Sequence, residues 1–259
     1  MTHGTVHLRR SGRVRVIVLD RPDQANALDM SMAQQLRKVV EELGRDTGCV
    51  LIRAEGRAFC AGGDVAAFAA AEPPGQFLAE LADELHKSVA ALAAAEFPVI
   101  AAVHGWATGA GMSLAAISDI VLAGASARFR AAYPGVGLSP DGGLSWSLPR
   151  LVGRSRAAEL LLTNRAVTAE EAARIGLVAQ VVPDADLEEE ALTLARQLAD
   201  GPTTALGRTK KLLADGHASL TDQLAAEATS IALCADGPEG RTGVAAFLEG
   251  RAPVFHPET

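Results

Sequence analysis

The sequence predicts an α/β fold, because short apolar strands alternate with helical segments along the first half of the chain. Residues 14–19 and 49–53 are apolar, β-branched runs typical of buried strands, and a helical pattern runs from Leu28 to Gly44 between them. Strand, helix and strand in this order favour a crossover unit. In a third stretch, residues 97–119, another buried strand passes through glycines into a helix.

Length, composition and charge exclude several classes of protein. With 259 residues, 49% of them apolar, the chain can bury a sizeable core as one domain or one domain with a helical extension. The net charge of −7 is spread over interspersed acidic and basic residues. There is therefore no basic footprint for nucleic acid, and we expect no nucleic-acid partner.

The cysteines and the longest uncharged stretch bear on the compartment. Cys49, Cys60 and Cys234 are odd in number, far apart and not in metal-ligand spacing. They predict free thiols, no metal site and a cytoplasmic location. Residues 97–118 carry no charge over about the length of a membrane span, but Pro98 and three glycines interrupt them. With no cationic region at the N-terminus, we expect a buried core segment and no membrane partner.

The elements follow in order along the chain. The first strand stops at Pro22, residues 24–27 form a loop, and Asp29 or Ser31 is the expected N-cap of the first helix. Further helices are predicted over residues 77–92, 144–148, 154–163 and from Thr168 to Gly176, and a strand over residues 177–182. The remainder is helical with breaks at residues 201–202, 215–216 and 236–238, and Lys210 and Lys211 are expected on a solvated face.

Two strand-to-helix connections carry the chemistry that the sequence suggests. Residues 57–64 run through Gly62 and Gly63 to Asp64, which is placed to accept backbone N–H bonds in the turn. About fifty residues later, Gly109-Ala110-Gly111 opens another helix, whose first N–H groups lack intrahelical partners. Each connection can present one N–H to the same carbonyl oxygen. Two such donors form an oxyanion hole, which stabilises an enolate or a tetrahedral intermediate derived from a thioester.

These motifs resemble the crotonase family, the enoyl-CoA hydratase/isomerase superfamily. The resemblance rests on residues 58–64 and 98–111, which carry AFCAGGD and PVIAAVHGWATGAG. The match extends over almost the whole chain through five further segments: Arg21-Pro22, Asn26-Ala27-Leu28, Ser118-Asp119-Ile120, Thr163-Asn164-Arg165 and residues 172–178.

The resemblance implies a fold, a substrate and an assembly. The fold would be repeated ββα units over residues 1–200, followed by a C-terminal helical region, residues 201–259, that forms homotrimers or dimers of trimers. The substrate would be an acyl-CoA thioester, and no cofactor is implied beyond that CoA. The thioester oxygen would be held by the N–H groups of Ala61 and Ala110. The remaining implied substrate-binding positions are Gly62, Gly63 and Gly109 in the two glycine connections, Gln24, Ala25 and Ala27 at the adenine of CoA, and Asp64, which closes the first connection.

Departures from the family pattern bear on the reaction. In the hydratases of this family two glutamates hold and activate a water, and the matching positions here are Ser113 and Tyr133. Neither can act as a carboxylate, whereas hydration needs a base for the water and an acid for Cα, each worth about 10² to 10⁴ in rate. Ordinary hydration is therefore disfavoured, although an atypical hydratase stays an alternative. Ser113 and Tyr133 are expected to line the acyl site.

Asp141 is the remaining candidate for proton transfer. It lies in a proline-glycine turn before a short helix, where an aspartate commonly serves as turn former or N-cap. The stretch also resembles the Pro-Asp turn of family isomerases, in which this position carries the catalytic aspartate. One carboxylate suits a double-bond shift, because the same group can take a proton from Cα and return it at Cγ. The sequence therefore favours an isomerase with Asp141 as its single acid and base.

Two other functions stay open at this point. His86, on the helix predicted over residues 77–92, resembles together with Asp141 the catalytic pair of 4-chlorobenzoyl-CoA dehalogenases. There the aspartate would attack the ring and the histidine would activate the hydrolytic water. Alternatively His86 is a packed or surface residue. Because both hydratase glutamates are missing, the chain could also be a catalytically silent acyl-CoA binder.

Overall fold

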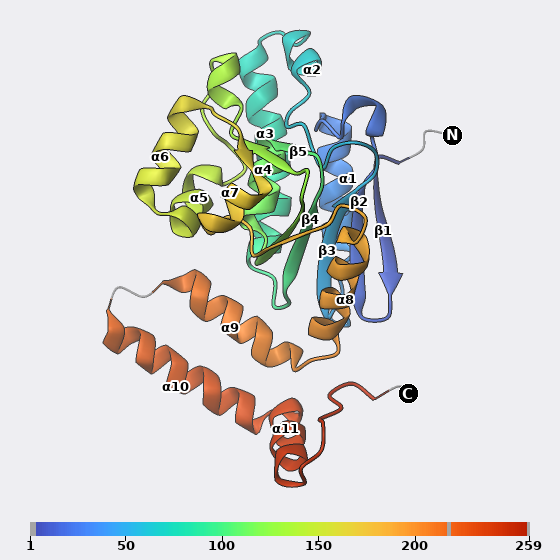
Figure 1. Ribbon diagram of the computed structural model, residues 1–259, viewed down its shortest axis with the longest axis vertical. Coiled ribbons are helices and arrows are strands. Elements are labelled where there is room, and N and C mark those ends of the chain that lie inside the picture. Colours follow the sequence, from blue (N-terminus) through green and yellow to red (C-terminus); the bar gives the residue numbers. More distant parts are fainter. Residues whose placement is uncertain (1–3, 217–218, 258–259) are drawn as a thin grey trace.

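A six-stranded sheet forms the centre of the molecule (Figure 1). The structure is a computed structural model that describes residues 4–216 and 219–257. In spatial order the strands are β1 (Val6–Ser11), β2 (Val14–Leu19), β3 (Cys49–Ala54), β4 (Val99–Val103), β6 (Ile120–Gly124) and β9 (Gln180–Val182). β1 and β2 pair antiparallel, and every later pair is parallel. The parallel pairs confirm the predicted α/β class.

Helices cover both faces of this sheet, so its strands alternate between two apolar clusters. On β2, Ile17 and Leu19 belong to the larger cluster, which includes residues of α1 (Met30–Glu41) and α3 (Pro74–Ala93). Val14, Val16 and Val18 point the other way and join apolar residues of α8 (Leu187–Ala199). This is the period-two alternation of a strand buried on both faces.

A smaller sheet stands beside the carboxyl end of β4. It consists of β5 (Trp106–Thr108), β7 (Arg128–Arg130) and β8 (Val167–Thr168). β5 follows β4 after only two residues and leads through Gly109 into α4 (Ala110–Ile117). The remaining helices of the core are α2 (Val65–Ala69), α5 (Leu144–Val152), α6 (Arg154–Thr163), α7 (Ala169–Arg174) and the 3-10 turns η1 (Pro22–Gln24) and η2 (Tyr133–Val136).

Three helices extend away from the sheets, and Figure 1 shows them below the core in orange and red. They are α9 (Thr203–Asp215), α10 (Leu220–Asp236) and α11 (Pro238–Leu248). α10 contacts α9 and α11, and it has no buried residue along its described length. A long helix with no buried face is unusual for an isolated chain, because helices gain most of their stability from packing an apolar face.

Lys210 on α9 corrects the expectation of a solvated face. Its side chain is buried, its Nζ donates to Leu92 O at 2.8 Å, and it lies 2.9 Å from Asp119 Oδ2. Asp119 in turn accepts the N–H of Val99, the first residue of β4, at 2.7 Å. Lys210 therefore ties the C-terminal helices to the strand that leads to α4. Lys211 is exposed as predicted.

Most predicted elements are confirmed to within a few residues. Asp29 is the N-cap of α1 and accepts the Met32 N–H at 2.8 Å. α3 and α5 are longer than predicted, and the last strand of the sheet is shorter. β1 was not predicted, because this edge strand is paired on one side only and carries exposed arginines. In the described part of the chain, no helix is long and apolar enough to cross a membrane.

Candidate active site

The two glycine connections lie side by side, as the sequence predicted. Cys60 N–H donates to Trp106 O at 3.0 Å, and Thr108 N–H donates back to Cys60 O at 2.9 Å. Where α4 begins, Gly111 packs directly on the first connection, since a Cβ there would come within 2.3 Å of Cys60 O. Only glycine permits this approach. The start of α4 is thereby pressed against residues 60–63.

Ala61 is not the free donor that the resemblance implied. Its N–H donates to Ala25 O at 3.0 Å, so it serves to hold the first connection against the loop of residues 24–27. Next to Ala61 lies the buried thiol of Cys60. Burial raises the pKa of that thiol to about 12, which keeps it protonated and unreactive.

Gly63 has the available N–H in this connection. Leu28 N–H donates to Gly62 O at 2.7 Å, and Asp64 N–H donates to Leu28 O at 2.9 Å. In such a bridge the residue between the two bonds turns its own N–H to the opposite side. Among the described residues no acceptor bonds to the Gly63 N–H, and a Cβ built there meets no atom within 4 Å.

The second available donor is the N–H of Ala110, as predicted. Ala110 is the first residue of α4, so its N–H has no intrahelical partner. The preceding Gly109 has φ of 51°, donates to Arg130 O at 3.0 Å and contacts the first connection near Gly62. The geometry thus exposes one backbone donor from each connection, at Gly63 and Ala110.

Asp64 has the structural role that the sequence assigned to it. It is the N-cap of α2, accepting the Ala67 N–H at 3.2 Å, and it pairs with Arg21 at 2.9 Å. Burial of Asp64 disfavours its charged form, but the hydrogen bonds from Arg21 and from the Ala67 N–H outweigh burial and lower its pKa. The carboxylate therefore fixes the turn immediately after Gly63.

The loop of residues 24–27 is held from within by Asn26. This fully buried side chain donates to Glu55 O and Ala58 O, each at 2.8 Å, and accepts the Arg21 N–H at 2.7 Å. It was not among the predicted site residues, although its left-handed φ of 56° is one that asparagine adopts more readily than most residues. The predicted adenine contacts of Gln24, Ala25 and Ala27 stay predictions.

Three residues that the sequence singled out come together beside α4. Tyr133 Oη lies 2.7 Å from Asp141 Oδ1 and 3.1 Å from Ser113 Oγ. The Ser113 hydroxyl is also 3.0 Å from Asp141 O and 3.2 Å from Gly109 O. Ser113 lies one turn into the helix whose first N–H is that of Ala110. The contacts of Ser113 and Tyr133 therefore hold the Asp141 turn against the first turn of the helix that begins at Ala110.

The surrounding chain brings this cluster together. Ala132 adopts a left-handed φ of 67°, and its N–H donates to Asn164 Oδ1 at 2.8 Å, which turns the chain so that Tyr133 enters the core. Gly142 follows Asp141, and a Cβ there would lie 2.7 Å from the Ser113 Cβ. Glycine lets the Asp141 turn approach α4 this closely.

His86 reaches the same turn from α3. Its Nε2 accepts the Gly142 N–H at 3.1 Å, and the side chain is exposed. The accepting nitrogen carries no proton in this arrangement, and its lone pair is engaged by the backbone. His86 therefore contacts the residue next to Asp141 through its main chain.

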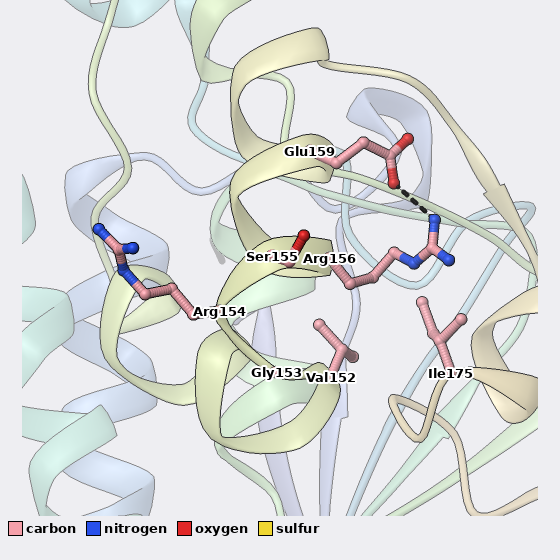
Figure 2. Close-up of a pocket in the computed structure, with 7 residues that line it drawn as sticks. All are labelled: Val152, Gly153, Arg154, Ser155, Arg156, Glu159 and Ile175. Atoms are coloured by element: carbon pink, nitrogen blue, oxygen red, sulfur yellow. Dashed lines mark hydrogen bonds and ion pairs between the residues drawn. The ribbon is translucent and has the colours of Figure 1, made fainter.

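A surface hollow lies at the start of α6, away from this cluster (Figure 2). The charged residues Arg154, Arg156 and Glu159 line it, together with Val152, Gly153, Ser155 and Ile175. In Figure 2 Arg156 turns toward Glu159, with 2.9 Å between Nη1 and Oε2, while Arg154 points away. None of the predicted site residues lines this hollow.

Comparison with known proteins agrees with the motifs. A family model described as enoyl-CoA hydratase/isomerase matches residues 9–258. A protein of Rhodobacter capsulatus named probable enoyl-CoA hydratase is 38% identical over 259 residues, covering 98% of this chain and 99% of that protein. The 1,2-epoxyphenylacetyl-CoA isomerase of Escherichia coli is 38% identical over 250 residues, covering 93% of this chain and 94% of that protein.

Solved structures give the same result for the fold. An enoyl-CoA hydratase of Mycobacterium smegmatis superimposes with a TM-score of 0.91 at 32% identity, covering 98% of this chain and 99% of that chain. The fold is therefore the crotonase fold that the motifs implied. On the family match and the two relatives, the chain belongs to the enoyl-CoA hydratase/isomerase family.

Proposed function

We propose that this protein is an acyl-CoA double-bond isomerase in which Asp141 is the single acid and base. The observation that carries the proposal is the cluster beside α4. It fixes the Asp141 turn against the helix that begins at Ala110, and it fills the two hydratase glutamate positions with the hydroxyls of Ser113 and Tyr133. The name of the Escherichia coli relative, an isomerase, also supports this choice.

In the proposed mechanism the thioester carbonyl accepts hydrogen bonds from the N–H groups of Gly63 and Ala110. Asp141 removes a proton from Cα, and the negative charge moves onto the thioester oxygen, where the two backbone donors stabilise it. The protonated carboxyl then returns the proton at Cγ, so the double bond moves into conjugation with the thioester. No group beyond the CoA of the substrate is needed, so we propose that there is no cofactor.

Hydration is the first alternative, because several relatives are named hydratases. It would need a second group to activate water, and neither the Ser113 nor the Tyr133 hydroxyl is a carboxylate. The test is a panel of β,γ- and α,β-unsaturated acyl-CoAs with straight and cyclic acyl groups. We expect conversion of β,γ- to α,β-unsaturated thioesters with little 3-hydroxyacyl-CoA. No conversion of any β,γ-unsaturated member would refute the isomerase.

The same panel separates two further alternatives. Chloride release from a 4-chlorobenzoyl-CoA would favour a dehalogenase with Asp141 as nucleophile and His86 as base. Against it, His86 Nε2 is engaged by the Gly142 N–H. Binding of acyl-CoA without turnover of any member would favour a silent binder.

We also propose that the protein works in the cytoplasm as a homotrimer or a dimer of trimers. The support for assembly is the apolar surface of the C-terminal helices, where large side chains stay exposed. On α10 these are Leu220, Leu224, Ile231 and Leu233, and on α11 Val244, Phe247 and Leu248. Leu224 and Ile231 lie seven residues apart on one helical face. Replacing both with glutamate should lower the mass measured by light scattering, and an unchanged mass would contradict a contact through α10.

A further inference from the structure

The hydrogen bond between Tyr133 and Asp141 has a defined direction. An ionised carboxylate can only accept, whereas a phenol has one proton to donate. At 2.7 Å between Tyr133 Oη and Asp141 Oδ1, the phenol is therefore the donor. Burial, and then the charge of Asp141, raise the pKa of Tyr133, so the phenol keeps this proton across the working pH range.

The bond makes the two carboxylate oxygens unequal. Oδ1 is tied to a buried phenol, while no described residue donates to Oδ2. Tyr133 itself is fixed at its backbone by the left-handed turn at Ala132 and lies against Gly109. A side chain held at one oxygen keeps its rotamer and presents the other oxygen in a constant direction.

We propose that Tyr133 is a positioning residue that fixes Oδ1 of Asp141 and leaves Oδ2 as the atom that transfers the proton. The role of Oδ2 rests on the proposed function, whereas the hydrogen bond does not. Ser113 is the secondary support: its hydroxyl reaches Tyr133 Oη and the main-chain carbonyl of Asp141, but not the carboxylate. Ser113 and Tyr133 occupy the two positions that carry glutamate in the hydratases, and in this site they support the carboxylate of Asp141.

The decisive variant is Tyr133→Phe, which keeps the ring and removes only the hydroxyl. Without the hydroxyl, Asp141 Oδ1 loses its hydrogen bond and the carboxylate can adopt other rotamers, which should affect the chemical step more than substrate binding. We expect kcat to fall about tenfold, with KM for the acyl-CoA within about twofold. Lys211→Met, which changes an exposed residue outside the cluster, is the control and should leave kcat and KM unchanged.

A second measurement does not depend on turnover. The Asp141 carboxyl is observed by ¹³C NMR at pH 7 in the full-length protein and in Tyr133→Phe, and the resonance is assigned by its absence in Asp141→Asn. A shifted or broadened carboxyl resonance in Tyr133→Phe supports the proposal even if no substrate is turned over, in which case only the proposed function fails. An identical carboxyl resonance in the two proteins would overturn the proposal. So would an unchanged kcat in an active Tyr133→Phe enzyme.

Discussion

The candidate site has two halves, one formed by main-chain groups and the other by side chains. The backbone half consists of the N–H groups of Gly63 and Ala110, and its geometry is fixed by β4, β5 and the bonds between the two glycine connections. The side-chain half consists of Ser113, Tyr133 and Asp141 and depends on turns at residues 132 and 141–143. We therefore expect that side chains in the second half can be replaced without disturbing the first. Such a division would let one fold keep its two backbone donors while the chemistry of the neighbouring side chains changes.

The largest expected effect comes from removing the carboxylate of the side-chain half. Asp141→Asn should lower kcat by about 10² to 10⁴, while the dissociation constant for a saturated acyl-CoA stays within a few-fold. Turnover measured beside calorimetric binding checks both. Parallel loss of binding would show that the two halves are not separable.

The backbone half is tested by removing one N–H. Gly63→Pro should lower kcat by about 10² to 10³, because one of two donors to the developing oxyanion is lost. Gly63→Ala is the control, since it keeps the N–H and its Cβ has open space. Circular dichroism and thermal unfolding establish that both variants fold. Equal activity of the two variants would remove Gly63 from the oxyanion hole.

The support of the backbone half by the C-terminal helices is tested at Lys210. Lys210→Met leaves Asp119 without its partner and should lower the free energy of unfolding by about 3 kcal/mol. The exposed neighbour gives the control, Lys211→Met, which should change it by no more than about 0.5 kcal/mol. Urea unfolding at pH 7 compares the two. Similar values would mean that the Lys210 ion pair adds nothing.

The smallest effect is expected at Asp64, which fixes the turn after Gly63. Its pKa is lowered in the folded state, so its contribution to stability is full well above the unfolded value of about 4 and is lost as the pH falls through the folded value. Asp64→Asn should therefore cost about 1 to 2 kcal/mol at pH 7 and less at pH 3. A cost that is constant with pH would show that the charge is not involved.

Much of the fold could be predicted because its strands and helices carry local signals. The strands at residues 14–19 and 49–53, the cap at Asp29 and the helix at residues 154–163 each follow from apolar period or capping chemistry. β1 and the small sheet could not be predicted, since short or one-sided strands have too few apolar residues to show a period.

The candidate site likewise has residues that a sequence motif identifies and features that depend on how distant segments pack. Ser113, Tyr133 and Asp141 were found by position in the motifs, and the structure brings them into contact. The prediction of Ala61 as a free donor was wrong, because which N–H stays available depends on how residues 25 and 28 pair with the first connection. The burial of Lys210 likewise depends on where α9 docks, which no local pattern records.

The central claim is that one carboxylate moves one proton, and isotope transfer tests it most directly. A β,γ-unsaturated acyl-CoA carrying deuterium at Cα is converted in ordinary water under single-turnover conditions, and the product is examined by mass spectrometry and NMR. If Asp141 alone takes and returns the proton, part of the deuterium appears at Cγ of the α,β-unsaturated product. Only solvent hydrogen at Cγ, or a 3-hydroxyacyl-CoA as the main product, would contradict it.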